Sequence, residues 1–183
     1  LHAPQFEINT QSDNDKLGLP VFVDGAPTID ISQAVTYTLA STTGFGGSNL
    51  LQLNYVVWLP QRAPVGPLDL FPGKIARIIW RATLDESGEG LLYDSIHSCG
   101  CYHKYFLASD KLKPRLPALS EEPANIISIA HMDTKQGLRL LITSNEHFIV
   151  GIEPQRPIVD ASYTMADYSA LYTLSSDAGG SWF

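Results

Sequence analysis

The sequence predicts a mainly β fold, either an antiparallel β-sandwich or an open barrel, with one short C-terminal helix. Three observations support this prediction. Several segments alternate apolar and polar side chains with the period of two that is typical of half-buried strands. Glycine, proline, asparagine and aspartate divide these segments at short intervals, as they do in turns and loops. Helical spacing of apolar residues occurs in one late segment only.

The alternation predicts strands in chain order, beginning with a hairpin. Val35, Tyr37 and Leu39 alternate with small or polar residues, a glycine cluster at 44–47 ends that strand, and the alternation resumes after Leu50. Residues 60–72 contain four prolines, and proline lacks the amide donor that a sheet needs. This stretch is therefore not expected to form a central strand. Strands are predicted at 20–23, 34–40, 50–57, 74–84, from 91 onward, 126–132, 138–143 and 147–152, and the last three are expected to form a meander.

The predicted strand at 74–84 has arginine side chains on one face and apolar side chains on the other. Its two arginines, Arg77 and Arg81, point to one face, which predicts a half-buried strand. The opposite face carries Ala76, Ile78, Trp80, Ala82 and Leu84. After the turn at 85–90 a return strand completes a hairpin. Near the C-terminus, residues 163–174 have apolar residues at helical spacing and predict the one helix.

Length and composition describe an ordinary globular domain. The chain has 183 residues, of which 44% are hydrophobic and 17% charged, enough for one compact domain, or two small ones, with a core of its own. Its best apolar run, residues 50–59, is too short to span a membrane. Nineteen acidic residues against twelve basic ones give a net charge of −7, which argues against nucleic acid as a partner.

The expected organisation has three parts. Residues 1–33 form an irregular leading segment, residues 34–160 form the antiparallel β domain, and residues 161–183 form a short helix and a tail. The chain starts without methionine and ends on an apolar Trp182-Phe183 pair. We therefore expect a processed or truncated piece whose tail leads to a further domain.

The most unusual segment lies at residues 97–103, which hold two of the five histidines and both cysteines. If the segment is a strand, His97, Cys99, Cys101 and His103 point to one face. An extended strand separates the two histidines by roughly 20 Å, too far for both to bind one metal ion. All four residues can share a metal only if the chain bends, and Gly100 is the residue that permits a bend.

Four interpretations of this segment compete. The two cysteines with one or both histidines suit a zinc site or a soft copper site. Alternatively, Cys99 and Cys101 form a strained local disulfide with a structural or redox role. In a third interpretation, one cysteine is a nucleophile activated by His97 or His103. In the last, the cysteines are small apolar groups and the histidines have ordinary hydrogen-bond partners.

Two other histidines are weaker candidates. His131 and His147 are expected at strand positions in the core or at an edge, although either one can complete a metal site begun elsewhere. A catalytic site needs an acid or base on the same face as the histidines. Asp94 is the one nearby candidate, and the strand period places it on the opposite face, which favours binding over catalysis.

The box Tyr-Asp-Ser-Ile-His-x-Cys-Gly-Cys-Tyr-His at 93–103, together with residues 50–55 and Trp58, resembles a set of uncharacterised bacterial envelope-associated proteins that are longer than this chain. The resemblance covers roughly residues 34–106. It implies a bacterial source and a fragment of a larger protein, and it brings no activity, cofactor or catalytic residue with it.

These observations lead to one functional expectation and one alternative. We expect a binding or assembly module of the periplasm or cell envelope, with an envelope protein as partner and a His/Cys site that binds zinc or another transition metal or forms a disulfide. The alternative is an enzyme, either a metal-assisted hydrolase or one with a cysteine nucleophile.

Overall fold

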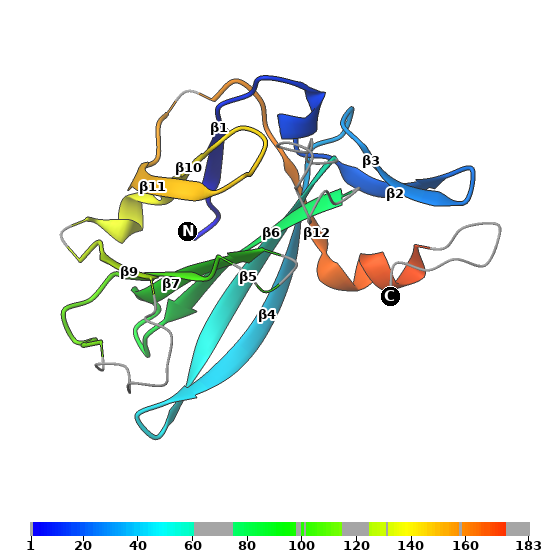
Figure 1. Cartoon of the computed structure of the whole chain (residues 1–183). Helices are drawn as coiled ribbons and strands as arrows, with labels where there is room; N and C mark the ends of the chain where they lie inside the picture. The colour runs from blue at the N-terminus through cyan, green and yellow to red at the C-terminus, as the bar shows by residue number, and fades with distance from the viewer. Residues whose placement is uncertain are drawn as a thin grey trace, which may run out of the picture.

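The computed structural model describes residues 2–60, 75–97, 100, 102–114, 125–130, 132–157 and 159–174. As predicted, the fold is mainly β, and Figure 1 shows its sheets. One sheet has seven strands in the order β12-β4-β5-β6-β7-β8-β9, a second has the order β1-β10-β11, and β2 and β3 form a two-stranded ribbon. The strands are β1 (Gln5–Ile8), β2 (Leu19–Val23), β3 (Ala26–Asp30), β4 (Val35–Phe45), β5 (Ser48–Pro60), β6 (Ile75–Leu84), β7 (Gly90–His97), β8 (Lys104–Leu107), β9 (Asn125–Ser128), β10 (Leu138–Ile142), β11 (Ile149–Pro154) and β12 (Thr164–Asp167).

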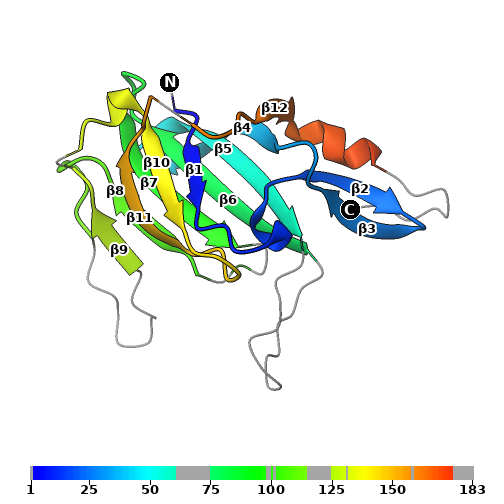
Figure 2. The ribbon, with the colours of Figure 1, turned by 90° about the horizontal axis from the view of Figure 1, so that it is seen from above.

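The two larger sheets face each other, and the main core lies between them (Figure 2). We call the side of the seven-stranded sheet that meets the three-stranded sheet its inner face. Fully buried aromatic rings fill the centre of this core, where Trp80 stacks on Tyr93 at 5.5 Å between ring centroids and Phe106 lies 5.6 Å from Trp80. The three-stranded sheet contributes Leu138, Leu140, Ile142 and Ile149. Burying side chains of this size removes a large apolar area from water, which makes this layer contact the main source of stability.

A second, smaller core covers one end of the opposite, outer face. Val56 and Trp58 of β5 pack there with Ile29 of the β2–β3 ribbon and with Leu171 of η3 (Tyr168–Thr173). Strand β5 is therefore buried on both faces from residue 54 to 59, which explains why its sequence there is nearly continuously apolar.

Much of the predicted strand pattern is confirmed. The hairpin β4–β5 pairs Phe45 with Ser48 across the glycine turn, and β6 pairs antiparallel with β7. The inner face of β6 carries Ile78, Trp80, Ala82 and Leu84, as the alternation predicts. Strands β10 and β11 also form the expected hairpin.

Two predictions differ from the structure because they concern long-range pairing. The meander is wrong, since β9 pairs with β8 in the large sheet while β10 and β11 belong to the other sheet. The sheets are not purely antiparallel, because β1–β10, β12–β4 and β8–β9 are parallel pairs. Parallel neighbours are joined by long connections, which local alternation does not reveal.

Both ends of the chain also differ from their predictions. The leading segment contains β1, β2 and β3 and the short 3-10 helix η1 (Asp13–Asp15), more regular structure than its turn-rich sequence indicates. The predicted C-terminal helix begins as strand β12, and only Tyr168–Thr173 coils, as a 3-10 helix. Among the described residues, no helix is long and apolar enough to cross a membrane.

Gly90 tests the placement of the buried aromatic layer. A Cβ atom at Gly90 would lie 2.2 Å from the hydroxyl oxygen of Tyr93, whose ring is fixed in the core. We expect Gly90→Ala to lower the free energy of unfolding by about 1–3 kcal/mol, as overpacking does. Urea denaturation of the purified variant measures this change.

Gly44→Ala is the matched control, because a Cβ there meets nothing within 4 Å and the substitution also lies in a hairpin strand. Its unfolding free energy should stay within about 0.5 kcal/mol of the wild type or rise slightly. Equal effects of the two substitutions would contradict the position assigned to Tyr93.

Candidate functional site

The segment that carries the candidate site residues is a turn, not a continuous strand. Strand β7 ends at His97, and the chain reverses so that Ser95 of β7 pairs with Lys104 of β8. The amide of Gly100 donates to the carbonyl of His97 at 2.9 Å, and Gly100 and Tyr102 have positive φ angles of 78° and 57°. Gly100 thus provides the bend that its sequence position permits.

Because of this reversal, the shared face that a continuous strand would give is not found for His97 and His103. His97 lies beside Ile78 of the inner core, whereas His103 contacts side chains of the outer face. The strand period applies only while the chain stays extended, and it is lost in the turn. Cys99 and Cys101 lie outside the described residues, as does His131.

On the inner side, His97 helps to join the two sheets. Its Nε2 atom lies 3.2 Å from the carbonyl oxygen of His147, in the turn between β10 and β11. Its ring also contacts Phe148 and Tyr102, with centroids 5.5 and 5.4 Å away. Lys104 makes a second contact between the two sheets by donating to the carbonyl of Ile149 at 2.7 Å.

On the outer side, His103 belongs to a network of four residues, which we call the outer network: Arg81, Asp94, His103 and Tyr105. Asp94 Oδ1 lies 3.0 Å from His103 Nε2 and accepts from Arg81 Nε and Nη2 at 2.8 and 2.6 Å. The Asp94 side chain is only 3% exposed, while those of Arg81 and His103 are 30% and 27% exposed. A buried carboxylate thus lies beneath two partly accessible donors.

One proton arrangement satisfies both ring nitrogens of His103. Its Nε2–H donates to Asp94, and its Nδ1 accepts from the Tyr105 hydroxyl at 3.0 Å. Burial raises the pKa of Tyr105, and the nearby charge of Asp94 raises it further against the opposing effect of Arg81, so the hydroxyl keeps its proton and donates. Arg81 Nη2, 3.3 Å from the same Nε2, is then a close neighbour and not a hydrogen-bond partner of the ring.

The strand register extends the outer network into a longer polar surface. One row of directly paired positions crosses β4 to β8 as Leu39, Asn54, Arg81, Asp94 and Tyr105. The next row begins with Ser41, Gln52 and Thr83, whose side chains form hydrogen bonds of 3.4 and 3.0 Å across the strands. We call these two rows with His103 the outer polar strip.

A separate polar cluster fixes the start of the chain to the other sheet. The buried Asp15 carboxylate accepts from the backbone amides of Gln11, Ser12 and Asn145 and from the Ser144 hydroxyl, at 2.8 to 3.1 Å. The fully buried His147 ring lies 3.1 Å from Asp15 through Nε2. We call this group the Asp15 cluster, and we assign it a structural role because every contact joins parts of the fold.

The two charged partners in the Asp15 cluster have shifted pKa values. Burial alone would raise the pKa of Asp15, but backbone hydrogen bonds from Asn145, Gln11 and Ser12 and the Ser144 hydroxyl outweigh it, and the pKa falls to about 2. Burial lowers the pKa of His147 despite the opposing effect of Asp15. The ring is therefore neutral at pH 7 and the carboxylate is charged.

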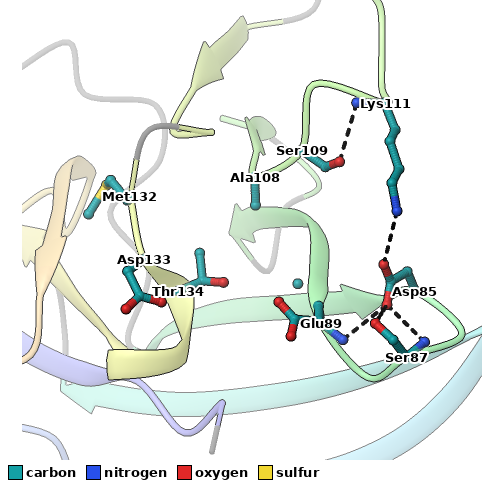
Figure 3. A pocket seen from close by; sticks show the side chains of 10 residues that line it. Asp85, Ser87, Glu89, Ala108, Ser109, Lys111, Met132, Asp133 and Thr134 are labelled. Atoms are coloured by element: carbon teal, nitrogen blue, oxygen red, sulfur yellow. Dashed lines mark hydrogen bonds and ion pairs between the residues drawn. The ribbon is translucent and has the colours of Figure 1, made fainter.

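A hollow of about 300 Å³ lies between the β6–β7 turn, the loop after β8 and η2 (Thr134–Gln136), as Figure 3 shows. Its lining is acidic, but its carboxylates already have partners. Asp85 accepts from Ser87 and from the Glu89 amide, which lowers its pKa, and Glu89 pairs with Lys135 at 2.7 Å. We therefore regard the hollow as a solvated turn region.

The described part of the chain holds no group of three or more His, Cys, Asp or Glu side chains that could bind a metal ion. A metal bound by His103 would have to displace Asp94 or Tyr105 from a ring nitrogen. Comparison with known proteins finds no matching family model, no matching curated protein and no matching solved structure.

Sequence reasoning missed Arg81, Asp94 and Tyr105 as neighbours of His103. A usable signal was present, because alternation places Arg81 on the outer face of β6 and Asp94 on the outer face of the strand that follows its turn. Opposite charges on facing strands tend to pair directly. The bend at Gly100, which brings His103 to Asp94, is not visible in that pattern.

The pair Arg81–Asp94 can be tested by a double-mutant cycle. Arg81→Leu leaves a buried carboxylate without its main counter-charge, and we expect a loss of about 3–5 kcal/mol of unfolding free energy. The double variant Arg81→Leu with Asp94→Leu should be markedly more stable than that single variant. Urea denaturation measures the unfolding free energies. If the effects of the two substitutions on these free energies simply added, the result would contradict the outer network.

Asp15 predicts a specific loss of stability in acid. A carboxyl whose pKa is lowered by folding stabilises the folded state above its ordinary pKa of 3.8, and that stabilisation disappears as the pH falls toward 2. The wild type should therefore exceed Asp15→Asn by about 2 kcal/mol at pH 5, and the difference should shrink toward pH 2. Urea midpoints across this range measure it, and a constant difference would disprove the assignment.

Proposed function

We propose that this chain is a binding or assembly module of a bacterial envelope protein and that it recognises its ligand through the outer polar strip. The observation that carries this proposal is the outer network, in which partly exposed Arg81 and His103 are held by the buried Asp94. Side chains held by such bonds are pre-organised, so little rotamer freedom is lost on binding. The bacterial and envelope parts of the proposal are supported by the resemblance over residues 34–106.

The same geometry favours binding over catalysis. The strand period predicts that Asp94 and His103 lie on opposite faces, which would prevent them from acting as an acid–base pair. In the structure the two side chains share the outer face, so this reason against catalysis no longer applies. Both ring nitrogens of His103 are nevertheless occupied, one by Asp94 and one by Tyr105. A general base must offer a free nitrogen to the proton that it takes, and this ring would first have to lose a partner.

A His/Cys site remains part of the proposal in a reduced form. Zinc or another transition metal, or a disulfide, would involve Cys99 and Cys101 with at most one of the two histidines, because His97 and His103 lie on opposite sides of the sheet. Zinc thiolate sites commonly take their remaining ligands from other elements of the fold.

A thermal-shift screen with matched variants tests the proposed function. Leu39 lies on the outer polar strip and is 47% exposed, whereas Leu51 lies on the opposite side of the same hairpin and is 43% exposed. The probes are neutral hexasaccharides, an acidic hexasaccharide, a mixed peptide library and zinc chloride. We expect at least one class to raise the Tm of the wild type and of Leu51→Glu, but not that of Leu39→Glu.

Any of three results would overturn the proposal. The first is that no probe class raises the Tm, and the second is that every stabilising class raises the Tm of both leucine variants equally. The third is that the chain hydrolyses p-nitrophenyl acetate and that His103→Gln abolishes this turnover, which would favour the enzyme. Stabilisation by zinc that Cys99→Ser removes would place a metal at the cysteines, separately from the strip.

A further inference from the structure

We infer that the ligand of the outer polar strip is a neutral, hydroxyl-rich polymer, that is, an uncharged oligosaccharide or polysaccharide chain. This inference rests on the proposed function and adds the chemical class of the ligand. It follows from the shape of the strip, from its charge balance and from the hydrogen-bonding capacity that its residues retain.

The shape favours an extended ligand. The strip follows five neighbouring strands from Leu39 on β4 to Tyr105 on β8, a span of about 19 Å at the usual strand spacing. Its side chains stand on a sheet face, whereas pockets for small molecules are concave and enclose most of their ligand. A chain of several sugar units laid across the strands would contact the members of the strip that reach the surface, such as Leu39, Arg81 and His103. Asn54, Thr83 and Asp94 are buried and would support those members from within the sheet.

The charge balance excludes strongly charged ligands. The strip holds one cation, Arg81, whose charge is neutralised by Asp94 at 2.6 Å, and its other members are uncharged side chains and a histidine. A polyanion needs clustered cations, and a polycation needs unpaired carboxylates. The net charge of −7 opposes polyanions further.

The hydrogen-bonding pattern matches hydroxyl groups, each of which both donates and accepts. Asp94 is only 3% exposed, so the polar groups that a ligand can reach are those of Arg81, which is 30% exposed, and of half-buried Tyr105. Arg81 supplies donors, and the Tyr105 hydroxyl oxygen can accept while its proton is donated to His103. Leu39 together with half-buried Leu92 and Leu107 offers apolar contact to the carbon-bound faces of sugar rings.

A protein partner fits less well. Strong protein interfaces centre on buried aromatic or arginine anchors surrounded by apolar contacts. On this strip the arginine is already held by Asp94, and Leu39 is the one strongly exposed apolar side chain among the described members. A polar, pre-organised surface of this kind is better matched by many weak hydrogen bonds along a repeating ligand.

Isothermal titration calorimetry tests this inference with hexasaccharides of β-1,4-glucose, β-1,4-N-acetylglucosamine and α-1,4-glucose, and with a galacturonate hexasaccharide as the charged comparison. We expect at least one neutral hexasaccharide to bind more tightly than the galacturonate. Leu39→Glu should weaken that binding at least about tenfold by placing a charge on the strip, and Leu51→Glu should leave it unchanged. Tyr105→Phe should weaken it more moderately, because the ring remains and the hydroxyl is lost.

The outcomes distinguish a failure of the inferred ligand class from a failure of the proposed function. If no neutral hexasaccharide binds, or if binding is indifferent to Leu39→Glu, the inference is wrong. If peptide or galacturonate shows the strip-dependent response in the thermal-shift screen while neutral sugars do not, the proposed function holds and the ligand class fails. If no probe responds in either experiment, both fail.

Discussion

The register of β4 to β8 is the constraint on which both the core and the candidate site depend. In this sheet the aligned residues Tyr55, Trp80 and Ser95 face inward, and their chain neighbours Asn54, Arg81 and Asp94 face outward. A slip of one residue in β6 or β7 would turn Arg81 or Asp94 toward the core and Trp80 or Tyr93 toward the outer face. The apolar layer that stabilises the fold therefore also aligns the polar rows, and no separate device is needed to assemble them.

Alternation predicted the parts of the fold that are local. Hairpins β4–β5, β6–β7 and β10–β11 follow from strand patterns separated by turn residues, and the faces of β6 follow from its period of two. Pairings between distant segments, such as β1 with β10 or β12 with β4, depend on which surfaces the hairpins leave uncovered. That choice is made by tertiary packing, so no short stretch of sequence encodes it.

The candidate site illustrates the same division. The sequence draws attention to residues 97–103 through the rarity of clustered histidine and cysteine, and both described histidines do have specific partners. A single bend at Gly100 nevertheless changes their relation, since it places one ring between the sheets and the other on the outer face. Composition can therefore single out an unusual segment without showing which of its residues lie together.

The contrast between the two histidine environments bears on function. In the Asp15 cluster, His147 is wholly buried and its contacts end within the fold, which is what a structural role requires. His103 has a similar carboxylate partner but remains partly accessible beside Arg81. Accessible donors above a buried acceptor therefore distinguish the outer network from the Asp15 cluster, and the proposed role in ligand recognition rests on this difference.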